Sequence, residues 1–186
     1  MATHIALLRG INVGGHNKVA MADLREVVTS LGHADVVTYI QSGNVVFTAA
    51  EQGADSKALA SALEQAIATA FGVRPTVVVL SREDLAQAVR DNPYASEPNP
   101  RYVHAVFFAE PPPALAAALS AAAEREAERA GRDSAQMVGR TLFVHTPDGF
   151  GRSDLALYLL GRRASPAAAG TARNWATVTK LVTLCG

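Results

Sequence analysis

The clearest structural pattern in the chain is VVTYIQSGNVVF, which runs from Val36 to Phe47. Two runs rich in β-branched and aromatic residues, Val36–Ile40 and Asn44–Phe47, flank Gln41-Ser42-Gly43. Such runs favour strands, and the polar, glycine-containing stretch between them is typical of a tight turn. We therefore predict a β-hairpin here.

The segments on either side of this hairpin carry strand and helix patterns in turn. Before it, the apolar run His4–Leu8 predicts a strand, and the apolar spacing over Met21–Leu31 predicts a helix with Gly32 as its C-cap. After it, we expect a helix at Ser56–Phe71 and a strand at Thr76–Leu80. The resulting order, β-α-β-β-α-β, is that of a ferredoxin-like plait.

The second half begins to repeat this order. Ser81 is a candidate N-cap for a short helix, and the proline-rich stretch Asn92–Pro100 predicts a linker. We then expect a strand at Tyr102–Phe108, a helix at Ala114–Arg129, a hairpin from Ala135 to His145, a helix at Asp154–Leu160 and a final helix from about Ala172 to Leu184. The predicted fold is α+β, with two ferredoxin-like halves, the second ending in helices.

Three predicted strands, Ile5–Leu8, Thr76–Leu80 and Val103–Phe108, are apolar at nearly every position. This pattern indicates sheets that are buried on both faces. Because the helices of a plait cover only one face, the other face needs cover from the other half or from the C-terminal helix. We therefore expect interlocked halves: residues 1–81, then 82–100 as a connecting helix and linker, then 101–186.

The composition narrows the class of protein. Seventeen basic and 17 acidic side chains balance, so no overall charge draws the chain to nucleic acid or to an anionic membrane. The single cysteine, Cys185, can form no internal disulfide, which fits a reducing compartment. No apolar run approaches the roughly 20 residues of a membrane span. We expect a cytoplasmic protein without a membrane association.

Three segments together match a known pattern: Arg9–Gly15, Thr38–Val45 and Thr171–Trp175. With them, the chain resembles the bacterial domain-of-unknown-function family 1697 over essentially its whole length. The resemblance implies two ferredoxin-like halves, and it implies no activity or cofactor. One position departs from the family. Where such sequences tend to have Ser-Lys after a glycine-rich turn, this chain has Ser153-Asp154, so a candidate positive charge is absent.

The predicted topology brings distant segments together. In a β-α-β-β-α-β plait the first two strands run parallel and the last two run back, so the first loop, the hairpin turn and the loop before strand four share one end. The first helix also begins there, with its unpaired amides. We predict an anion site at this end, formed by Arg9, Asn12, Gly14, Gly15, Asn17 and Lys18 of the loop, by Gln41, Ser42 and Asn44 of the turn, and by Arg74.

The loop Arg9–Lys18 carries the most suggestive chemistry. Gly14-Gly15 permits a concave run of backbone N–H groups between two cations, which suits a phosphate or a carboxylate. The spacing of Gly10 and Gly15 matches the start of a P-loop, but His16-Asn17 replaces the residues that would hold phosphate and magnesium, so we reject that motif. The alternative is structural: the glycines shape the loop and its asparagines satisfy the backbone.

Two further segments also allow two interpretations. The turn Gln41–Asn44 offers two amides and a hydroxyl to a ligand, or it serves ordinary turn chemistry. In the last helix, with Thr171 as candidate N-cap, Arg173 and Lys180 lie on one stripe that could direct two cations at a ligand. Arg173 could instead bind carbonyls between the halves. Trp175 is expected to anchor the core.

Three functions stay open. The first is a binding module for a small anionic ligand, phosphorylated or nucleotide-like. The second is a transferase-type enzyme in the same cleft, with Lys18, Arg173 or Lys180 stabilising charge, although none of the three segments that carry the family resemblance contains an Asp or Glu to act as a base. The third is a protein- or nucleic-acid-interaction domain.

Other chemistry is not supported by the sequence. The five histidines are scattered without the spacing of a metal site. Strands one and three offer only Phe47 for stacking on bases, which disfavours RNA binding through an open sheet. The sequence indicates no particular cofactor and no oligomeric state.

Overall fold

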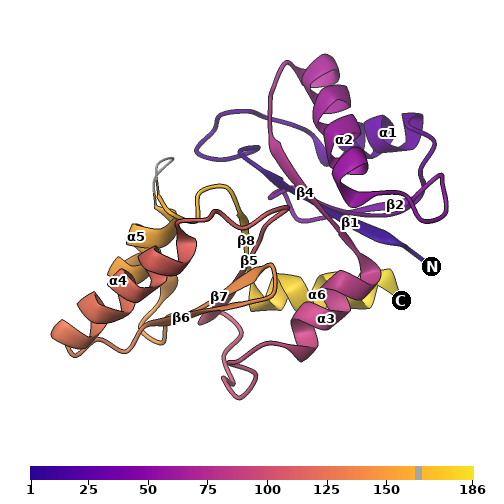
Figure 1. Cartoon of the computed structure of the whole chain (residues 1–186). Coiled ribbons are helices and arrows are strands. Elements are labelled where there is room, and N and C mark those ends of the chain that lie inside the picture. Colours follow the sequence, from indigo (N-terminus) through magenta and orange to yellow (C-terminus); the bar gives the residue numbers. More distant parts are fainter. Residues whose placement is uncertain (162–164) are drawn as a thin grey trace. The chain divides into compact units, whose positions relative to one another are not determined.

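Two four-stranded antiparallel sheets with six α-helices organise the described chain (Figure 1). The structure is a computed structural model that describes residues 1–161 and 165–186. The chain divides into two units. Unit 1 comprises Met1–Gln87 and Lys180–Gly186, and unit 2 comprises Ala88–Thr179. The fold class is therefore α+β, as predicted.

The sheet of unit 1 has the strand order β2-β3-β1-β4, and all neighbouring strands are antiparallel. Leu7 lies opposite Asn44, and Arg9 lies opposite Thr76. The elements of this unit are β1 (His4–Arg9), α1 (Met21–Ser30), β2 (Ala34–Tyr39), β3 (Asn44–Thr48), α2 (Ser56–Phe71), β4 (Thr76–Ser81) and the start of α3 (Arg82–Arg90).

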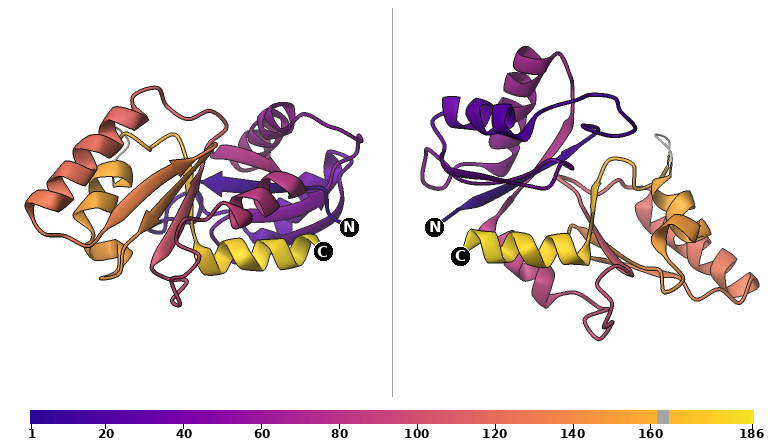
Figure 2. Two further views of the ribbon diagram at one scale, coloured as in Figure 1. Left: turned by 60° about the horizontal axis from the view of Figure 1, so that its bottom comes forward. Right: turned by 180° about the vertical axis from the view of Figure 1, so that it is seen from behind.

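Helices α1 and α2 lie side by side on one face of this sheet (Figures 1 and 2). Local capping fixes the ends of α2. The Asp55 carboxylate accepts the N–H of Ala58 at 2.8 Å, and Gly72 ends the helix with a φ of +68°. The buried core between helices and sheet includes Leu8, Phe47 and Ile67. Apolar burial on this face thus joins both helices to the sheet.

The other face of the same sheet is also buried. Its side chains alternate with those of the helix-covered face, and Ile5, Leu7 and Val78 are each at most 2% exposed. Unit 1 also contains Lys180–Gly186, which includes the C-terminal end of α6 (Trp175–Cys185). Burial on both faces agrees with the continuous apolar pattern of β1 and β4.

The sheet of unit 2 repeats this arrangement with the order β6-β7-β5-β8, again antiparallel throughout. Helices α4 and α5 pack on one face over a core that includes Phe108, Leu142 and Leu159. The elements are β5 (Val103–Phe107), α4 (Leu115–Glu128), β6 (Ser134–Val138), β7 (Thr141–His145), a 3₁₀ turn (Phe150–Arg152), α5 (Asp154–Leu160), β8 (Thr171–Asn174) and the start of α6.

The prediction that the second half ends only in helices is wrong. Thr171–Asn174 forms β8, which pairs with β5, so that Arg173 lies opposite Ala105. The expected N-cap at Thr171 is wrong for the same reason. Asn174 takes that role, because its side-chain oxygen accepts the N–H of Thr177 at 2.8 Å. Unit 2 therefore has a complete fourth strand before α6.

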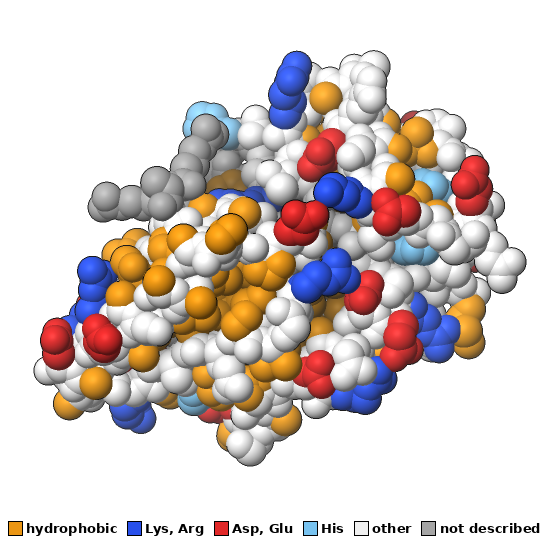
Figure 3. Space-filling model, viewed as in Figure 1, with side chains coloured by type: hydrophobic (Ala, Val, Ile, Leu, Met, Phe, Trp, Pro, Cys, Tyr) orange, Lys and Arg blue, Asp and Glu red, His pale blue; other side chains and the backbone are white. Residues whose placement is uncertain are grey.

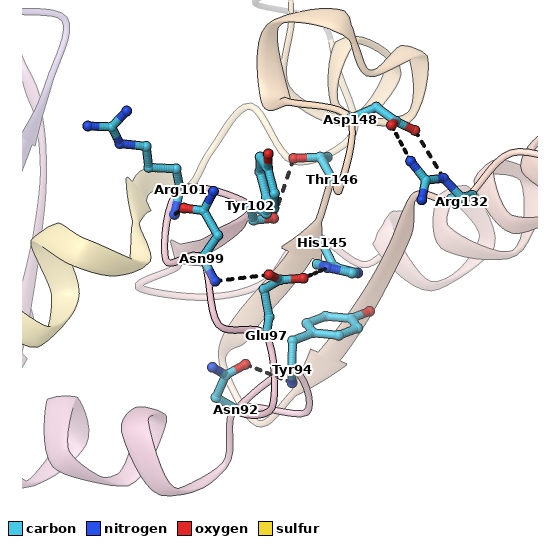
Figure 4. Close-up of polar contacts among 10 residues, drawn as sticks. All are labelled: Asn92, Tyr94, Glu97, Asn99, Arg101, Tyr102, Arg132, His145, Thr146 and Asp148. Carbon is cyan, nitrogen blue, oxygen red and sulfur yellow. Dashed lines mark hydrogen bonds and ion pairs between the residues drawn. The ribbon is translucent and has the colours of Figure 1, made fainter.

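The predicted linker Asn92–Pro100 is held against the β6–β7 hairpin (Figure 4). The Glu97 carboxylate lies 2.7 Å from Nε2 of His145, and its other oxygen accepts the N–H of Asn99 at 2.9 Å. The Tyr94 ring stacks on the His145 ring with centroids 5.1 Å apart. This segment is consequently an ordered part of unit 2.

Within the described residues, no helix is long and apolar enough to cross a membrane.

Candidate functional site

The three segments that were expected to share one end of unit 1 do so. We call them the loop end: Arg9–Lys18, Gln41–Asn44 and Phe71–Pro75. The strand register places Arg9 opposite Thr76 and Tyr39 opposite Asn44, so the three segments lie at the same end of the sheet's strands. A hydrogen bond joins two of them, because Nδ2 of Asn12 donates to the carbonyl of Gln41 at 3.0 Å.

Residues Asn12–Asn17 form a small hairpin, which we call the finger. Val13 and His16 make an antiparallel bridge, and the N–H of Asn12 donates to the carbonyl of Asn17 at 3.0 Å. Gly14 and Gly15 form its tip with φ angles of +57° and +80°. Positive φ at both tip positions is the requirement of a type I′ turn, which explains the two glycines.

The two asparagines of the loop bind its own backbone. Besides its bond to Gln41, the Asn12 side chain donates to the carbonyl of Val19 and accepts its N–H, both at 2.9 Å. Nδ2 of Asn17 donates to the carbonyl of Gly10 at 2.7 Å. These contacts support the structural interpretation of both asparagines.

The turn Gln41–Asn44 is also internally bonded. Asn44 is fully buried, and its Nδ2 donates to the carbonyl of Tyr39 at 2.9 Å and to Oγ of Ser42 at 3.0 Å. Gly43 packs so closely that a Cβ there would lie 2.7 Å from Cβ of Leu8. Gln41 and Ser42 are exposed, so they are the residues of this turn that a ligand can reach.

Positive charge collects at the loop end. Lys18 and Arg74 are exposed and Arg9 is partly buried, and none of the three segments contains an Asp or Glu. On the face shown in Figure 3, acidic and basic side chains are intermixed. Helix α1 also begins at this end, and its N-cap, Ala20, provides no side-chain hydrogen bond to the first-turn amides.

The cations do not all share one face of the sheet. By strand alternation, Arg9 belongs to the face of Ile5 and Leu7, which is opposite to the face covered by α1 and α2. Arg74 instead lines a groove of about 550 Å³ against α2. The fold therefore brings the backbones of the predicted site together while distributing its charged side chains around the loop end.

The two candidates from the C-terminal segment differ in environment. Arg173 is 8% exposed in β8, and its Nη1 donates to the carbonyl of Ala172 at 2.8 Å. Burial lowers the pKa of Arg173 to about 10. Lys180 is exposed on α6 and belongs to unit 1, whereas Arg173 belongs to unit 2.

Trp175, which was expected to anchor the core, is only partly buried. Its ring centroid lies 6.0 Å from that of Phe143, so it is not a fully buried anchor.

Sequence reasoning missed two polar features. In unit 2, Arg129 pairs with Glu126 at 2.6 Å and with Asp154, so the acidic residue that departs from the family pattern serves as an ion-pair partner between α4 and α5. In unit 1, the groove beside Arg74 is lined by polar residues of α2.

Among the described residues, no group of three or more His, Cys, Asp and Glu could hold a metal ion.

Comparisons with known proteins give one family and one similar structure, and neither description names an activity. The model of a family described as "Protein of unknown function (DUF1697)" matches residues 1–143. The structure of the conserved bacterial protein SP0830 from Streptococcus pneumoniae is similar, with a TM-score of 0.73 and 25% sequence identity, over 100% of this chain and 99% of that one. No curated protein gives a significant match.

Proposed function

Because the chain belongs to the DUF1697 family, whose description names no activity, we propose a function from the geometry of the site: the loop end of unit 1 binds a small anionic ligand. The observation that carries this proposal is the charge of the three converging segments. They contribute Arg9, Lys18 and Arg74 and no carboxylate, although the whole chain has a formal net charge of zero. A phosphate or carboxylate is the complement of such a surface.

The backbone of the loop end supports the same ligand class. The finger is held by hydrogen bonds of Asn12 and Asn17, so its glycine tip presents N–H groups without side chains in front of them. The uncapped amino end of α1 adds a favourable potential for negative charge. A preorganised site loses less entropy on binding, which favours affinity.

Binding is better supported than catalysis. A transferase needs a group that accepts or donates a proton. The three segments contain no Asp or Glu, and their one histidine, His16, is exposed in the finger, where no hydrogen bond among the described residues orients its ring. The exposed Gln41 and Ser42 can donate hydrogen bonds to an anion, and neither requires activation for that role. We therefore assign the loop end to recognition of an anionic group.

Isothermal titration calorimetry with inorganic phosphate and pyrophosphate tests the proposal. We expect Lys18→Ala and Arg74→Ala each to weaken binding about tenfold or more, because each removes a charge-assisted hydrogen bond worth on the order of 1.5 to 3 kcal/mol. Lys57→Ala is the matched control, since this exposed lysine lies in the first turn of α2, outside the loop end. Equal affinity in all three variants would refute the assignment.

We also propose that each unit is a ferredoxin-like half. The support is the order β-α-β-β-α-β in unit 1 combined with the strand order β4-β1-β3-β2, read from the β4 edge. Unit 2 has the corresponding order β8-β5-β7-β6. A comparison of the two units by superposition of their eight strands tests this point, because two ferredoxin-like halves should overlay strand on strand.

A further inference from the structure

The groove beside Arg74 lies between the outer surface of α2 and the segment that leads into β4. Its volume of about 550 Å³ falls within the range of small-molecule sites, roughly 300 to 1,000 Å³. Polar side chains dominate its lining: Ser61, Glu64, Gln65 and Thr69 of α2 together with Arg74. Because Arg74 belongs both to this groove and to the loop end, a ligand anchored on Arg74 would extend along α2.

The carboxylate of Glu64 has a fixed place in this groove. Its Oε1 accepts the N–H of Val77 at 2.8 Å, and Val77 belongs to β4, an edge strand of the sheet. Within the described part of the chain, Oε2 of Glu64 has no hydrogen-bond partner. An anchored carboxylate with an available oxygen is an acceptor for the hydroxyl groups of a ligand.

The other polar groups of the groove complete a set of donors and acceptors. Ser61, Gln65 and Thr69 follow one another at four-residue spacing, so they form one row along α2. Oγ1 of Thr69 donates to the carbonyl of Gln65 at 2.9 Å and keeps its lone pairs as acceptors. Across the described residues, the side chains of Ser61, Gln65 and Arg74 show no hydrogen bond or ion pair.

The groove has no surface for a nucleobase. Among the described residues that line it, Ala68 and Pro75 make the apolar contributions and none is aromatic. A base needs an apolar or aromatic wall for stacking, whereas a polyhydroxylated carbon chain needs many hydrogen-bonding groups. Of two kinds of phosphorylated molecule, nucleotides and sugar phosphates, the lining therefore favours sugar phosphates.

We infer that the groove binds the hydroxyl-bearing part of a sugar phosphate or polyol phosphate whose phosphate group is held by Arg74. This inference rests on the proposed function and specifies the ligand class. Glu64 and Gln65 accept hydrogen bonds from ligand hydroxyls, while Ser61 and Gln65 donate to them. The ligand thus gains contacts that inorganic phosphate cannot make.

Calorimetric titrations with inorganic phosphate, ribose 5-phosphate, glucose 6-phosphate and glycerol 3-phosphate test the inference. At least one of the three organic phosphates should bind tenfold or more tightly than inorganic phosphate. Gln65→Ala should abolish most of that advantage without changing the affinity for inorganic phosphate. Gln52→Ala, which replaces an exposed glutamine outside the groove, should leave both affinities unchanged.

The outcomes separate the two proposals. If inorganic phosphate binds through Arg74 but the organic phosphates bind no more tightly, the loop end binds anions and the inference about the groove is wrong. An advantage that survives Gln65→Ala also overturns the inference, because the hydroxyls are then recognised elsewhere. If no phosphate binds at millimolar concentration, the proposed function fails and the inference fails with it.

Discussion

The Asn12 side chain connects the first loop to the hairpin turn, since its Nδ2 donates to the Gln41 carbonyl at 3.0 Å while also donating to Val19 at 2.9 Å. Asn12 and Gln41 are 29 positions apart in the sequence, and only the sheet topology brings them together. One side chain thus fixes the relative position of two of the three segments of the loop end. The shape of the proposed site depends on it.

Replacing Asn12 should disorder the loop end. Asn12→Ala removes two donated hydrogen bonds and one accepted one, and it places alanine at a φ of +52°. We expect a loss of about 4 kcal/mol of unfolding free energy, from roughly 1 kcal/mol for each of the three hydrogen bonds and about 1 kcal/mol for the backbone conformation. Asn12→Gly is the control, because glycine accepts this φ and therefore loses only the hydrogen bonds. Urea denaturation measures both.

Two glycines of the loop end should respond differently to alanine. At Gly43 a Cβ would lie 2.7 Å from Cβ of Leu8 and 2.8 Å from Cδ1 of Ile11, and φ is +78°. At Gly14 the φ is +57°, but among the described residues no atom beyond the two chain neighbours lies within 4 Å of an added Cβ. We expect Gly14→Ala to cost about 1 to 2 kcal/mol of stability through backbone strain alone, and Gly43→Ala to cost clearly more. Equal melting temperatures for the two variants would contradict this packing.

Most elements of the fold follow from the sequence because their patterns are local. The bounds of α2, Ser56–Phe71, agree with the prediction, since its apolar spacing is clear and Gly72 ends it. Strand β8 was missed because Thr171–Asn174 has four residues, too few for a pattern, and lies directly before a helix. Its pairing with β5 is a tertiary effect that no local pattern contains.

The candidate site was predictable only in part. The convergence of Arg9–Lys18 with Gln41–Asn44 follows from topology, so it could be predicted once the element order was known. The burial of Asn44 could not, because the sequence does not show that the amide bonds to Tyr39 and Ser42 inside the turn. The groove was missed because the outer positions of α2 look like any solvent-exposed helix face.

Residues 1–81 should not fold alone. Unit 1 includes Lys180–Gly186, and the sheet face that carries Ile5, Leu7 and Val78 is buried. In the fragment this apolar face has no α6 residues to contribute to its cover, so we expect poorly dispersed amide signals and no cooperative unfolding. A soluble fragment that unfolds cooperatively would contradict the prediction of interlocked halves.

Acid should destabilise the protein through histidines whose pKa is lowered by burial. Burial lowers the pKa of His104 from 6.5 to about 4, and its ring packs on Phe150 with centroids 4.0 Å apart. The unfolded chain binds this proton at the higher pH, so stability is complete above about pH 6.5 and falls as the pH drops toward 4, by about 3 kcal/mol in total. His104→Gln should flatten the dependence of the melting temperature on pH. Part of the pH dependence should remain in this variant, because burial also lowers the pKa values of His4 and His33.

The original protein is the reference for this effect. If His104→Gln has the same pH profile of the melting temperature as the original protein, the imidazole of His104 is not a source of the acid sensitivity.

The most direct measurement for the proposed anion site is a titration of the ¹⁵N-labelled protein with inorganic phosphate, followed by amide chemical shifts. Binding at the loop end predicts that the largest shifts occur at the amides of Asn12–Lys18, of Gln41–Gly43 and of Arg74, and that Lys18→Ala reduces them together. Amides in the α4–α5 region of unit 2 should stay unchanged. Shifts that are absent at saturating phosphate, or that centre on other residues, would contradict the account.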